Sequence, residues 1–397
     1  MSTIFEPGAP AASGEIALCV PELGGNERKY VKECLDTNFV SSVGPFVGRF
    51  EREVATYLKA PYAVATINGT AALHIALLVA GVKPDDEVLV SALTFIAPAN
   101  AIRYAGAWPV PIDAESTYWQ IDPNRVVEFL ERDCDWHRGE LRNRKTGRRV
   151  SAIVPVHILG HPVDINPILD VARKFRLVVI EEATESLGAT YRNRMVGTLA
   201  DIACLSFNGN KIITTGGGGM LVTSNQQWAE KAKYLSTQAK DNPIEFVHNE
   251  VGYNYRLANI PAAIGVAQLE QLDHFIGVKR QIAAEYTEAL AGVPGLTLMQ
   301  ESDWASSVFW LFTILVDASE YGMSSRDLLQ RLATAGIQSR PLWQPLSKSP
   351  AHASAVVTGC PVAERLNEVA LSLPSSVGLT AEQQARVSAV VRDAHVG

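Results

Sequence analysis

Residues 202–224, IACLSFNGNKIITTGGGGMLVTS, place one lysine and four consecutive glycines between two apolar runs. The runs, 202–207 and 219–224, have the composition of buried strands. Lys211 is the only charged residue between them. The glycines at 216–219 lead into a strand and not into a helix, so they do not match a dinucleotide-binding or phosphate-binding loop. They predict a tight backbone bend behind the lysine.

Five similar runs lie upstream and alternate with helical patterns. They span residues 62–67, 87–93, 107–112, 151–156 and 176–181. Continuous apolar strands separated by helices are typical of a mainly parallel sheet that helices cover on both faces. The sequence therefore predicts an α/β fold whose large domain holds a mainly parallel, seven-stranded sheet.

The C-terminal part of the chain has a different pattern. Residues 262–290 carry apolar side chains at helical spacing and predict a long helix. Further on, 308–317 predicts a strand and 324–336 a capped helix. We therefore expect a large domain over residues 1–275 and a smaller α+β domain over residues 276–397.

Composition excludes several classes of function. The 397 residues are 47% hydrophobic, enough for a large core, and the net charge of -7 comes from mixed signs, which argues against a nucleic-acid-binding face. Residues 137–150 are locally basic and predict a surface hairpin that turns at Thr146 and Gly147. The five cysteines are scattered without a CxxC pair, so neither a disulfide framework nor a metal site is indicated.

Nothing in the sequence predicts membrane association. No apolar run approaches the roughly 20 residues that span a bilayer. The first residues, MSTIFEPGAPAASGEIAL, lack the basic region and apolar block of a signal peptide. We therefore expect a cytoplasmic protein.

Ligands of open α/β sheets bind at the carboxyl ends of strands, so the turns there hold the candidate site residues. Asn68, Gly69 and Thr70 open a helix whose first amides suit a phosphate or carboxylate, although the same residues fit an ordinary N-cap. Phe95 follows the next run, where its ring either covers a planar ligand or joins the core. We interpret His74, inside the helix, as a packed residue.

Three carboxylates, Glu181, Glu182 and Glu185, come at the end of the 176–181 run. Buried carboxylates are costly unless a cation or strong donor pairs with them, so a positive group should meet one of these. Lys211 is a candidate. In a partly dry pocket its neutral amine attacks a carbonyl to form a Schiff base, whereas the alternative is a surface lysine in a loop.

Taken in order, several motifs resemble the signatures of the DegT/StrS family of sugar aminotransferases over nearly the whole chain. The motifs are NGTAALHIAL (68–77), TFIAPANAI (94–102), VIEEATESLGA (179–189), SFNGNK (206–211), TTGGGGM (214–220), GYNYRL (252–257) and AAIGVAQL (262–269). The resemblance implies a fold-type-I transferase that uses pyridoxal 5'-phosphate. It also implies a homodimer with active sites at the subunit interface.

By position, the resemblance makes Lys211 the Schiff-base lysine, which holds the cofactor and then shuttles protons during transamination. Ser206 matches the serine that contacts the cofactor phosphate. Thr70 and Ala71, beside Gly69, match the phosphate-binding turn.

The remaining cofactor contacts follow in the same way. Phe95 matches the aromatic residue stacked on the pyridine ring, and Glu185 falls near the phenolic oxygen. Asn254 resembles the asparagine that reaches the phosphate of the neighbouring subunit. Glu182 stands where the family generally has the aspartate that pairs with the pyridine nitrogen, so the charge is kept and a methylene is added.

Four segments are most similar to the branch that aminates UDP-linked 4-keto-6-deoxy-N-acetylhexosamines with L-glutamate as donor. They are residues 38–51, 154–165, 235–243 and 339–346. The candidate substrate contacts within them are Ser41, Ser42, His157, Arg340 and Trp343. An arginine suits a carboxylate or phosphate, and a tryptophan can flank a sugar or base. His157 and Trp343 are equally compatible with packing roles.

Other functions fit less well. An aminotransferase for a 3-keto sugar, or for a dTDP- or GDP-linked sugar, stays open. A sugar 3-dehydratase of the same fold generally has histidine in place of Lys211. A regulatory cofactor-binding protein would need a DNA-binding module, and a nicotinamide-dependent enzyme a glycine fingerprint, and the sequence contains neither signal.

Overall fold

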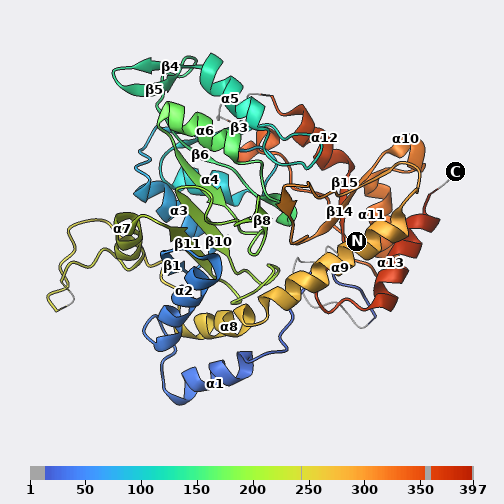
Figure 1. The fold of residues 1–397 in the computed structure, drawn as a ribbon, viewed down its shortest axis with the longest axis horizontal. Coiled ribbons are helices and arrows are strands. Elements are labelled where there is room, and N and C mark those ends of the chain that lie inside the picture. The colour runs from blue at the N-terminus through green and yellow to red at the C-terminus, as the bar shows by residue number, and fades with distance from the viewer. Residues whose placement is uncertain (1–13, 243, 354–358, 396–397) are drawn as a thin grey trace.

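The main sheet contains all seven predicted strands. The computed structural model describes residues 14–242, 244–353 and 359–395. Its central sheet has the order β1-β11-β10-β7-β6-β2-β3 (Figure 1). The strands are β1 (Tyr62–Thr66), β2 (Glu87–Ser91), β3 (Trp108–Ile112), β6 (Val150–Val154), β7 (Val178–Glu182), β10 (Ile202–Ser206) and β11 (Gly219–Thr223). Only β11 runs antiparallel to its neighbours, so the predicted α/β, mainly parallel sheet is confirmed.

Helices cover both faces of this sheet, which explains why its strands are apolar on both sides. One face packs against α3 (Gly69–Val79), α4 (Ala97–Tyr104) and α7 (Gln226–Ser236). The other face packs against α2 (Pro45–Leu58), α5 (Pro123–Arg132), α6 (Asn166–Phe175) and α8 (Asn259–Leu269). Helix α1 (Glu27–Asp36) lies outside this layer, against α8.

The basic hairpin exists, but its turn lies elsewhere. Strands β4 (Cys134–His137) and β5 (Glu140–Asn143) are joined at Arg138 and Gly139, both with positive φ. The expected turn, Thr146 and Gly147, is a second bend that leads into β6. Buried Glu87 at the start of β2 holds this bend, because its carboxylate accepts hydrogen bonds from Asn143 and Thr146 at 2.7 Å each.

The predicted long helix is two helices. Helix α8 ends at Leu269 and α9 (Leu272–Leu290) begins three residues later. The carboxylate of Glu270, between them, accepts hydrogen bonds from Asn26, Tyr30 and Arg49. These contacts tie the break to α1 and α2. Neither glycine nor proline marks this break in the sequence, so the helical pattern alone did not reveal it.

The small domain is built on an antiparallel sheet of order β12-β14-β15. Its elements are β12 (Leu296–Leu298), β14 (Phe312–Val316), β15 (Ala370–Leu373), α10 (Ala318–Tyr321), α11 (Ser325–Thr334), α12 (Pro361–Val369) and α13 (Ala381–Asp393). The predicted helix is confirmed as α11, which a capping box at Ser324 starts. The predicted strand is shorter, because residues 308–311 cross between the domains.

Small elements complete the fold. A three-stranded sheet joins β8 (Thr190–Tyr191), β9 (Arg194–Met195) and β13 (Ala305–Ser306), and 3-10 turns span Ile158–Gly160, Leu346–Lys348 and Pro350–His352.

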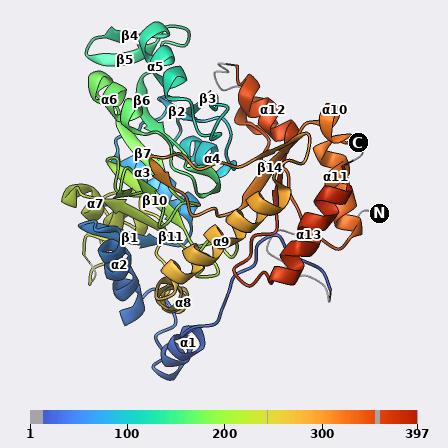
Figure 2. The ribbon, with the colours of Figure 1, turned by 45° about the vertical axis from the view of Figure 1, so that its right-hand side comes forward.

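The predicted boundary at residues 275 and 276 falls inside α9, which runs from the large sheet to the small domain (Figure 2). Phe275 packs in the core of the large domain, whereas Ile282 packs in that of the small domain. The N-terminal segment also joins the small domain, since Ile16 pairs with Ile337. A division into 1–275 and 276–397 stays a prediction.

Some whole-molecule features are plain from the described part of the chain. None of its helices is both long enough and apolar enough to cross a membrane. All five cysteines are buried free thiols, and no group of three or more His, Cys, Asp or Glu is arranged to hold a metal among the described residues.

Candidate active site

A cavity of about 540 Å³ lies where the sheet meets the small domain. Most of the predicted site residues line it: Gly69, Thr70, Phe95, Glu182, Glu185, Ser206, Lys211, Arg340 and Trp343. They come from turns that follow strands of the main sheet and from the small domain. The carboxyl edge of the sheet therefore gathers residues that are far apart in sequence, as the fold class predicts.

Lys211 faces this cavity and is not a surface lysine. Its side chain is 13% exposed, and its Nζ lies 3.2 Å from Oε1 of Glu185. The same Nζ lies 4.3 Å from the centroid of the Trp310 ring. The other oxygen of Glu185 accepts the amide of Leu159 at 2.8 Å, which fixes the carboxylate beside the lysine. The positive group expected near the strand-end carboxylates is thus Lys211.

The adjacent carboxylates of Glu181 and Glu182 have different surroundings. Glu181 is fully buried and accepts three amides, from Gly197, Leu199 and Ala200, at 2.6 to 2.9 Å. It is a structural anchor. Glu182 lines the cavity, and burial, followed by repulsion from Glu185, raises its pKa to about 7. Thr184 donates its hydroxyl to Glu182 Oε1 at 2.8 Å.

His157, expected to contact the substrate, does not line the cavity. Its side chain is fully buried. Nδ1 accepts the amide of Val163 at 2.9 Å, so Nε2 carries the proton and donates to Glu181 at 3.2 Å. Both ring nitrogens are therefore occupied by protein groups, and His157 packs beneath the site. The packing interpretation, also open from the sequence, describes it.

The start of α3 has the geometry of both an N-cap and an anion site. Asn68 Oδ1 accepts the amide of Ala71 at 2.8 Å, and Ala71 does not line the cavity, so it is not placed as a phosphate contact. Gly69 and Thr70 line the cavity, and the first amides of a helix have no partner within it.

Close packing explains the glycines on both sides of this turn. A Cβ on Gly219 would lie 2.4 Å from the carbonyl carbon of Asn68, and a Cβ on Gly69 would lie 2.9 Å from Cβ of Ser206. Neither position tolerates a side chain without movement. Gly219, the last glycine of the run, is thus needed where β11 passes the start of α3. This close contact is a reason for glycine in addition to the expected bend behind Lys211.

Besides Ala71 and His157, three further predicted residues lie outside this cavity. Ser41 and Ser42 belong to the loop between α1 and α2, where the Ser41 carbonyl accepts the amide of Asn259 at 2.6 Å. Asn254 is exposed and bridges to Thr237. No contact within the described chain brings them to Lys211.

Two cavity residues, Thr184 and Trp310, were not predicted from the sequence. Trp310 sits in VFWLF, which predicted only a strand, and Thr184 follows the conspicuous carboxylates. His74 is packed as expected, at 4% exposure, among the rings of Tyr104, Tyr253 and Tyr255.

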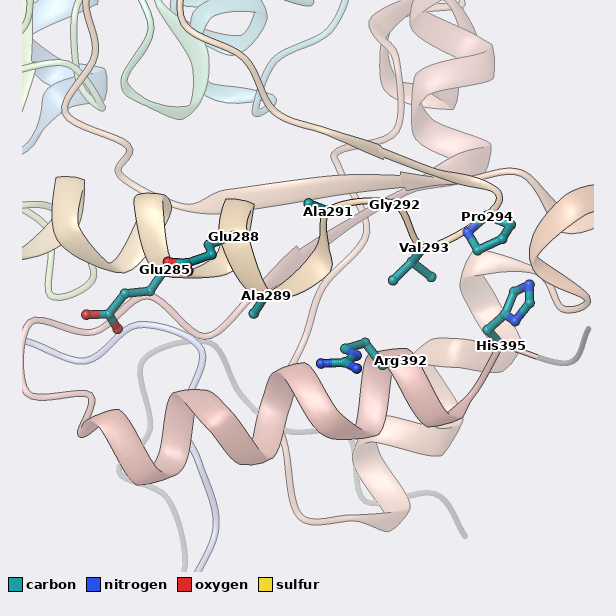
Figure 3. A pocket seen from close by; sticks show the side chains of 9 residues that line it. All are labelled: Glu285, Glu288, Ala289, Ala291, Gly292, Val293, Pro294, Arg392 and His395. Atoms are coloured by element: carbon teal, nitrogen blue, oxygen red, sulfur yellow. The ribbon is translucent and has the colours of Figure 1, made fainter.

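A second hollow lies apart from these residues, between the ends of α9 and α13 (Figure 3). Its lining includes Glu285, Glu288, Arg392 and His395. None of the predicted site residues lies there, so it is not the candidate active site.

Comparison with known proteins decides the family. Residues 21–392 match the DegT/DnrJ/EryC1/StrS aminotransferase family. The chain belongs to this family. The GDP-perosamine synthase of Caulobacter vibrioides is 39% identical over 378 residues, covering 95% of this chain and 97% of that protein.

Two further proteins show how far the likeness extends. The GDP-perosamine synthase of Escherichia coli O157:H7 is 37% identical, covering 91% of this chain and 94% of that protein. The crystal structure of S. venezuelae DesV shares 30% identity and a TM-score of 0.84, covering 94% of this chain and 95% of that one. The protein is therefore a sugar-nucleotide aminotransferase that depends on pyridoxal phosphate, with the fold-type-I architecture.

The cavity fits this cofactor. The start of α3 and Ser206 provide donors for a phosphate, and the Lys211 amine is available for the aldehyde. A buried, costly carboxylate at Glu182 suits a cationic ring nitrogen. When bound, pyridoxal phosphate supplies an electron sink that stabilises negative charge at the reacting carbon.

Proposed function

We propose that this protein moves an amino group from L-glutamate to a nucleotide-linked 4-keto-6-deoxy sugar. The observation that carries the proposal is the position of the Lys211 amine. The amine lies beside Glu185 in a cavity that is also lined by the start of α3, which suits an anion. The chain that forms this cavity matches the aminotransferase family. That arrangement provides the amine that binds the cofactor and a basic group that moves protons.

The cofactor-binding roles are assigned as follows. Ser206, Gly69 and Thr70 hold the phosphate, Lys211 the reactive carbon and Glu182 the ring nitrogen. Phe95 stacks on the ring. Its position at the cavity with 57% of its surface exposed supports this, because such a large apolar side chain is available for a planar ligand. Glu185 lies beside the phenolic oxygen and holds Lys211 close to the reacting carbon.

Lys211 performs the proton transfers. As a free amine, Lys211 would take the proton from the Cα of glutamate and return it to the cofactor carbon. Glu185 and Trp310 both contact this amine, at 3.2 Å and at 4.3 Å from the ring centroid.

Arg340 and Trp343 are the proposed contacts of the small domain with substrate. Both line the cavity, and burial lowers the pKa of Arg340. A partly desolvated guanidinium attracts a carboxylate or diphosphate strongly, so Arg340 suits the donor carboxylate or the nucleotide. Trp343 offers a flat surface to the sugar or the base.

The remaining predicted contacts, Ser41, Ser42 and Asn254, support a homodimer with shared sites. They lie outside the cavity of their own chain, so a role in the site requires a second subunit. Apolar side chains are exposed in the same loops, including Phe39 at 45%, Val43 at 61% and Val251 at 82%. Such exposure is typical of a surface that a partner covers. We propose that Asn254 reaches the phosphate site of the partner.

Two nucleotides, UDP and GDP, are the candidates for the carrier of the substrate sugar. Segments 38–51, 154–165, 235–243 and 339–346 favour a UDP-linked 4-keto-6-deoxy-N-acetylhexosamine. The two relatives named GDP-perosamine synthase favour a GDP-linked sugar. In either case the product enters surface-glycan synthesis in the cytoplasm.

The test is a transamination assay with L-glutamate and a panel of UDP-, GDP- and dTDP-linked 4-keto-6-deoxy sugars, with 3-keto sugars as controls. Formation of 2-oxoglutarate and the amino sugar is followed by mass spectrometry. A strong preference for one 4-keto carrier identifies the substrate. Turnover with 3-keto sugars alone contradicts the proposal, as does binding of the cofactor without any transfer.

A further inference from the structure

Trp310 contacts the one amine on which the chemistry depends. The Lys211 Nζ lies 4.3 Å from the centroid of its ring, and Trp310 is only 4% exposed. On another side, Nζ lies 3.2 Å from Glu185. The free amine is therefore held between an aromatic face and a carboxylate, both of which favour an ammonium group.

Trp310 is itself held at both ends. Its indole Nε1 donates to the carbonyl of Asn210, the residue before Lys211, at 2.7 Å. Its own carbonyl accepts from Nζ of Lys279 at 3.0 Å. The first contact fixes the ring against the lysine loop, and the second fixes its backbone against helix α9. The ring face is thus presented to the amine in one orientation.

Lys279 is an unusual support for this purpose. It is 2% exposed, and its ammonium also donates to the carbonyl of Ser375 at 2.7 Å and lies 4.0 Å from Sγ of Cys19. These acceptors are neutral, and burial lowers the pKa of Lys279. Through these contacts Lys279 joins α9 to Trp310, to Ser375 and to the N-terminal segment from within the core.

We propose that Trp310 is a further catalytic residue that holds the released amine of Lys211, and that Lys279 is the positioning residue that holds Trp310. The inference rests on the proposed role of Lys211. In the donor half-reaction Lys211 would release the cofactor, which would take up the amino group and the Cα proton of glutamate. The Cα–N bond of glutamate would be replaced by a C=O bond whose oxygen comes from one water, which gives 2-oxoglutarate.

While Lys211 is bonded to the cofactor it has no ammonium group. The donor half-reaction releases Lys211 and so restores that group. A contact that stabilises the ammonium therefore favours the released state. It shifts the equilibrium of the half-reaction toward the pyridoxamine form. Loss of a buried cation–π contact corresponds to a shift of about 3-fold to about 30-fold.

The test measures that equilibrium by absorption, with the loaded enzyme in defined ratios of L-glutamate to 2-oxoglutarate. Trp310→Leu should lower the ratio of pyridoxamine to pyridoxal enzyme by about 3-fold to about 30-fold. Trp310→Phe, which keeps a ring but loses the indole N–H, should fall between it and the parent. Trp228→Leu, on α7 away from the cavity, is the matched control and should leave the ratio unchanged.

Lys279→Met tests the support. It should shift the ratio in the same direction by less, and it should add little to Trp310→Leu in the double variant. If Lys279→Met does not fold, the Trp310 variants still decide the main point.

Borohydride trapping separates this inference from the proposed function. If the cofactor is trapped on Lys211 but Trp310→Leu changes the ratio by less than about 2-fold, below the weakest cation–π contact, the inference is overturned and the function stands. If trapping labels another lysine, the proposed function itself fails. A ratio that rises in Trp310→Leu also overturns the inference.

Discussion

Replacing Glu182 by glutamine tests whether this carboxylate is placed to meet a cationic ring. Glu182 is 5% exposed, and burial, with repulsion from Glu185, raises its pKa from 4.5 to about 7. Attraction to Lys211 and hydrogen bonds from Thr184 offset only part of this rise in pKa. In the cofactor-free protein the charged form is therefore costly.

The sign and size of the effect follow from linkage. Because the folded-state pKa lies above the unfolded value, the contribution of Glu182 to stability is complete below pH 4.5 and is lost as the pH rises to about 7. At about 1.36 kcal/mol per pKa unit, the full loss is about 3 kcal/mol. Most of it, about 2.5 kcal/mol, falls between about pH 5 and about pH 8.

The assay is chemical denaturation of the cofactor-free protein at a series of pH values. Glutamine has the shape of glutamate without the charge. The free energy of unfolding of Glu182→Gln minus that of the parent should therefore increase by about 2.5 kcal/mol between about pH 5 and about pH 8. Glu181→Gln is the control. Its carboxylate accepts three amides, so that variant should be destabilised at pH 8.

A difference between Glu182→Gln and the parent that stays constant with pH would refute the reasoning, because the buried charge would then carry no cost. Turnover of the loaded enzyme gives the second arm. If Glu182 neutralises the ring nitrogen, Glu182→Gln should lose orders of magnitude in turnover while the fold stays intact. Full activity would place the partner of that nitrogen elsewhere.

Three other outcomes follow from the site. Borohydride should trap the cofactor on the peptide that contains Lys211, and Lys211→Ala should lose turnover while retaining the cofactor; trapping elsewhere would contradict its assignment. Asn254→Ala should weaken cofactor retention, and mixing it with Lys211→Ala chains should restore some activity once subunit exchange is confirmed; no recovery would count against a shared site. Glu182→Asp should lower activity, because shortening by one methylene breaks a contact adapted to glutamate; activity equal to the parent would show that no adaptation exists.

The main sheet was predictable because its strands are buried on both faces and therefore apolar throughout. The break between α8 and α9 was not, since it depends on what Glu270 contacts in α1 and α2. The hairpin turn was misplaced for a similar reason. Gly139 and Gly147 both adopt positive φ, and only the contacts of Glu87 distinguish the bend from the hairpin turn.

A place in the cavity was predictable for residues at or shortly after a strand end, such as Glu182 and Lys211, whereas their catalytic roles stay predictions. It was not predictable where a residue acts through packing. His157 follows a strand and has a titratable ring, yet it faces inward to Glu181. Trp310 comes from a segment between domains, and no periodicity within VFWLF indicates that its ring reaches Lys211.

The three carboxylates at and just after the end of β7 show how surroundings give identical side chains different roles. Successive residues of a strand point to opposite faces, so Glu181 and Glu182 enter different surroundings. The Glu181 carboxylate accepts hydrogen bonds from three amides and from a histidine N–H. These bonds compensate its charge and hold the loop around Gly197. Glu182 accepts hydrogen bonds from Thr184 and is attracted by Lys211, but burial and repulsion from Glu185 outweigh both, so its charged form stays costly. Glu185, one turn later, meets Lys211 instead. If Glu182 meets the cationic ring nitrogen as we propose, binding of the cofactor would relieve the cost of this buried charge, and that relief would contribute to cofactor affinity.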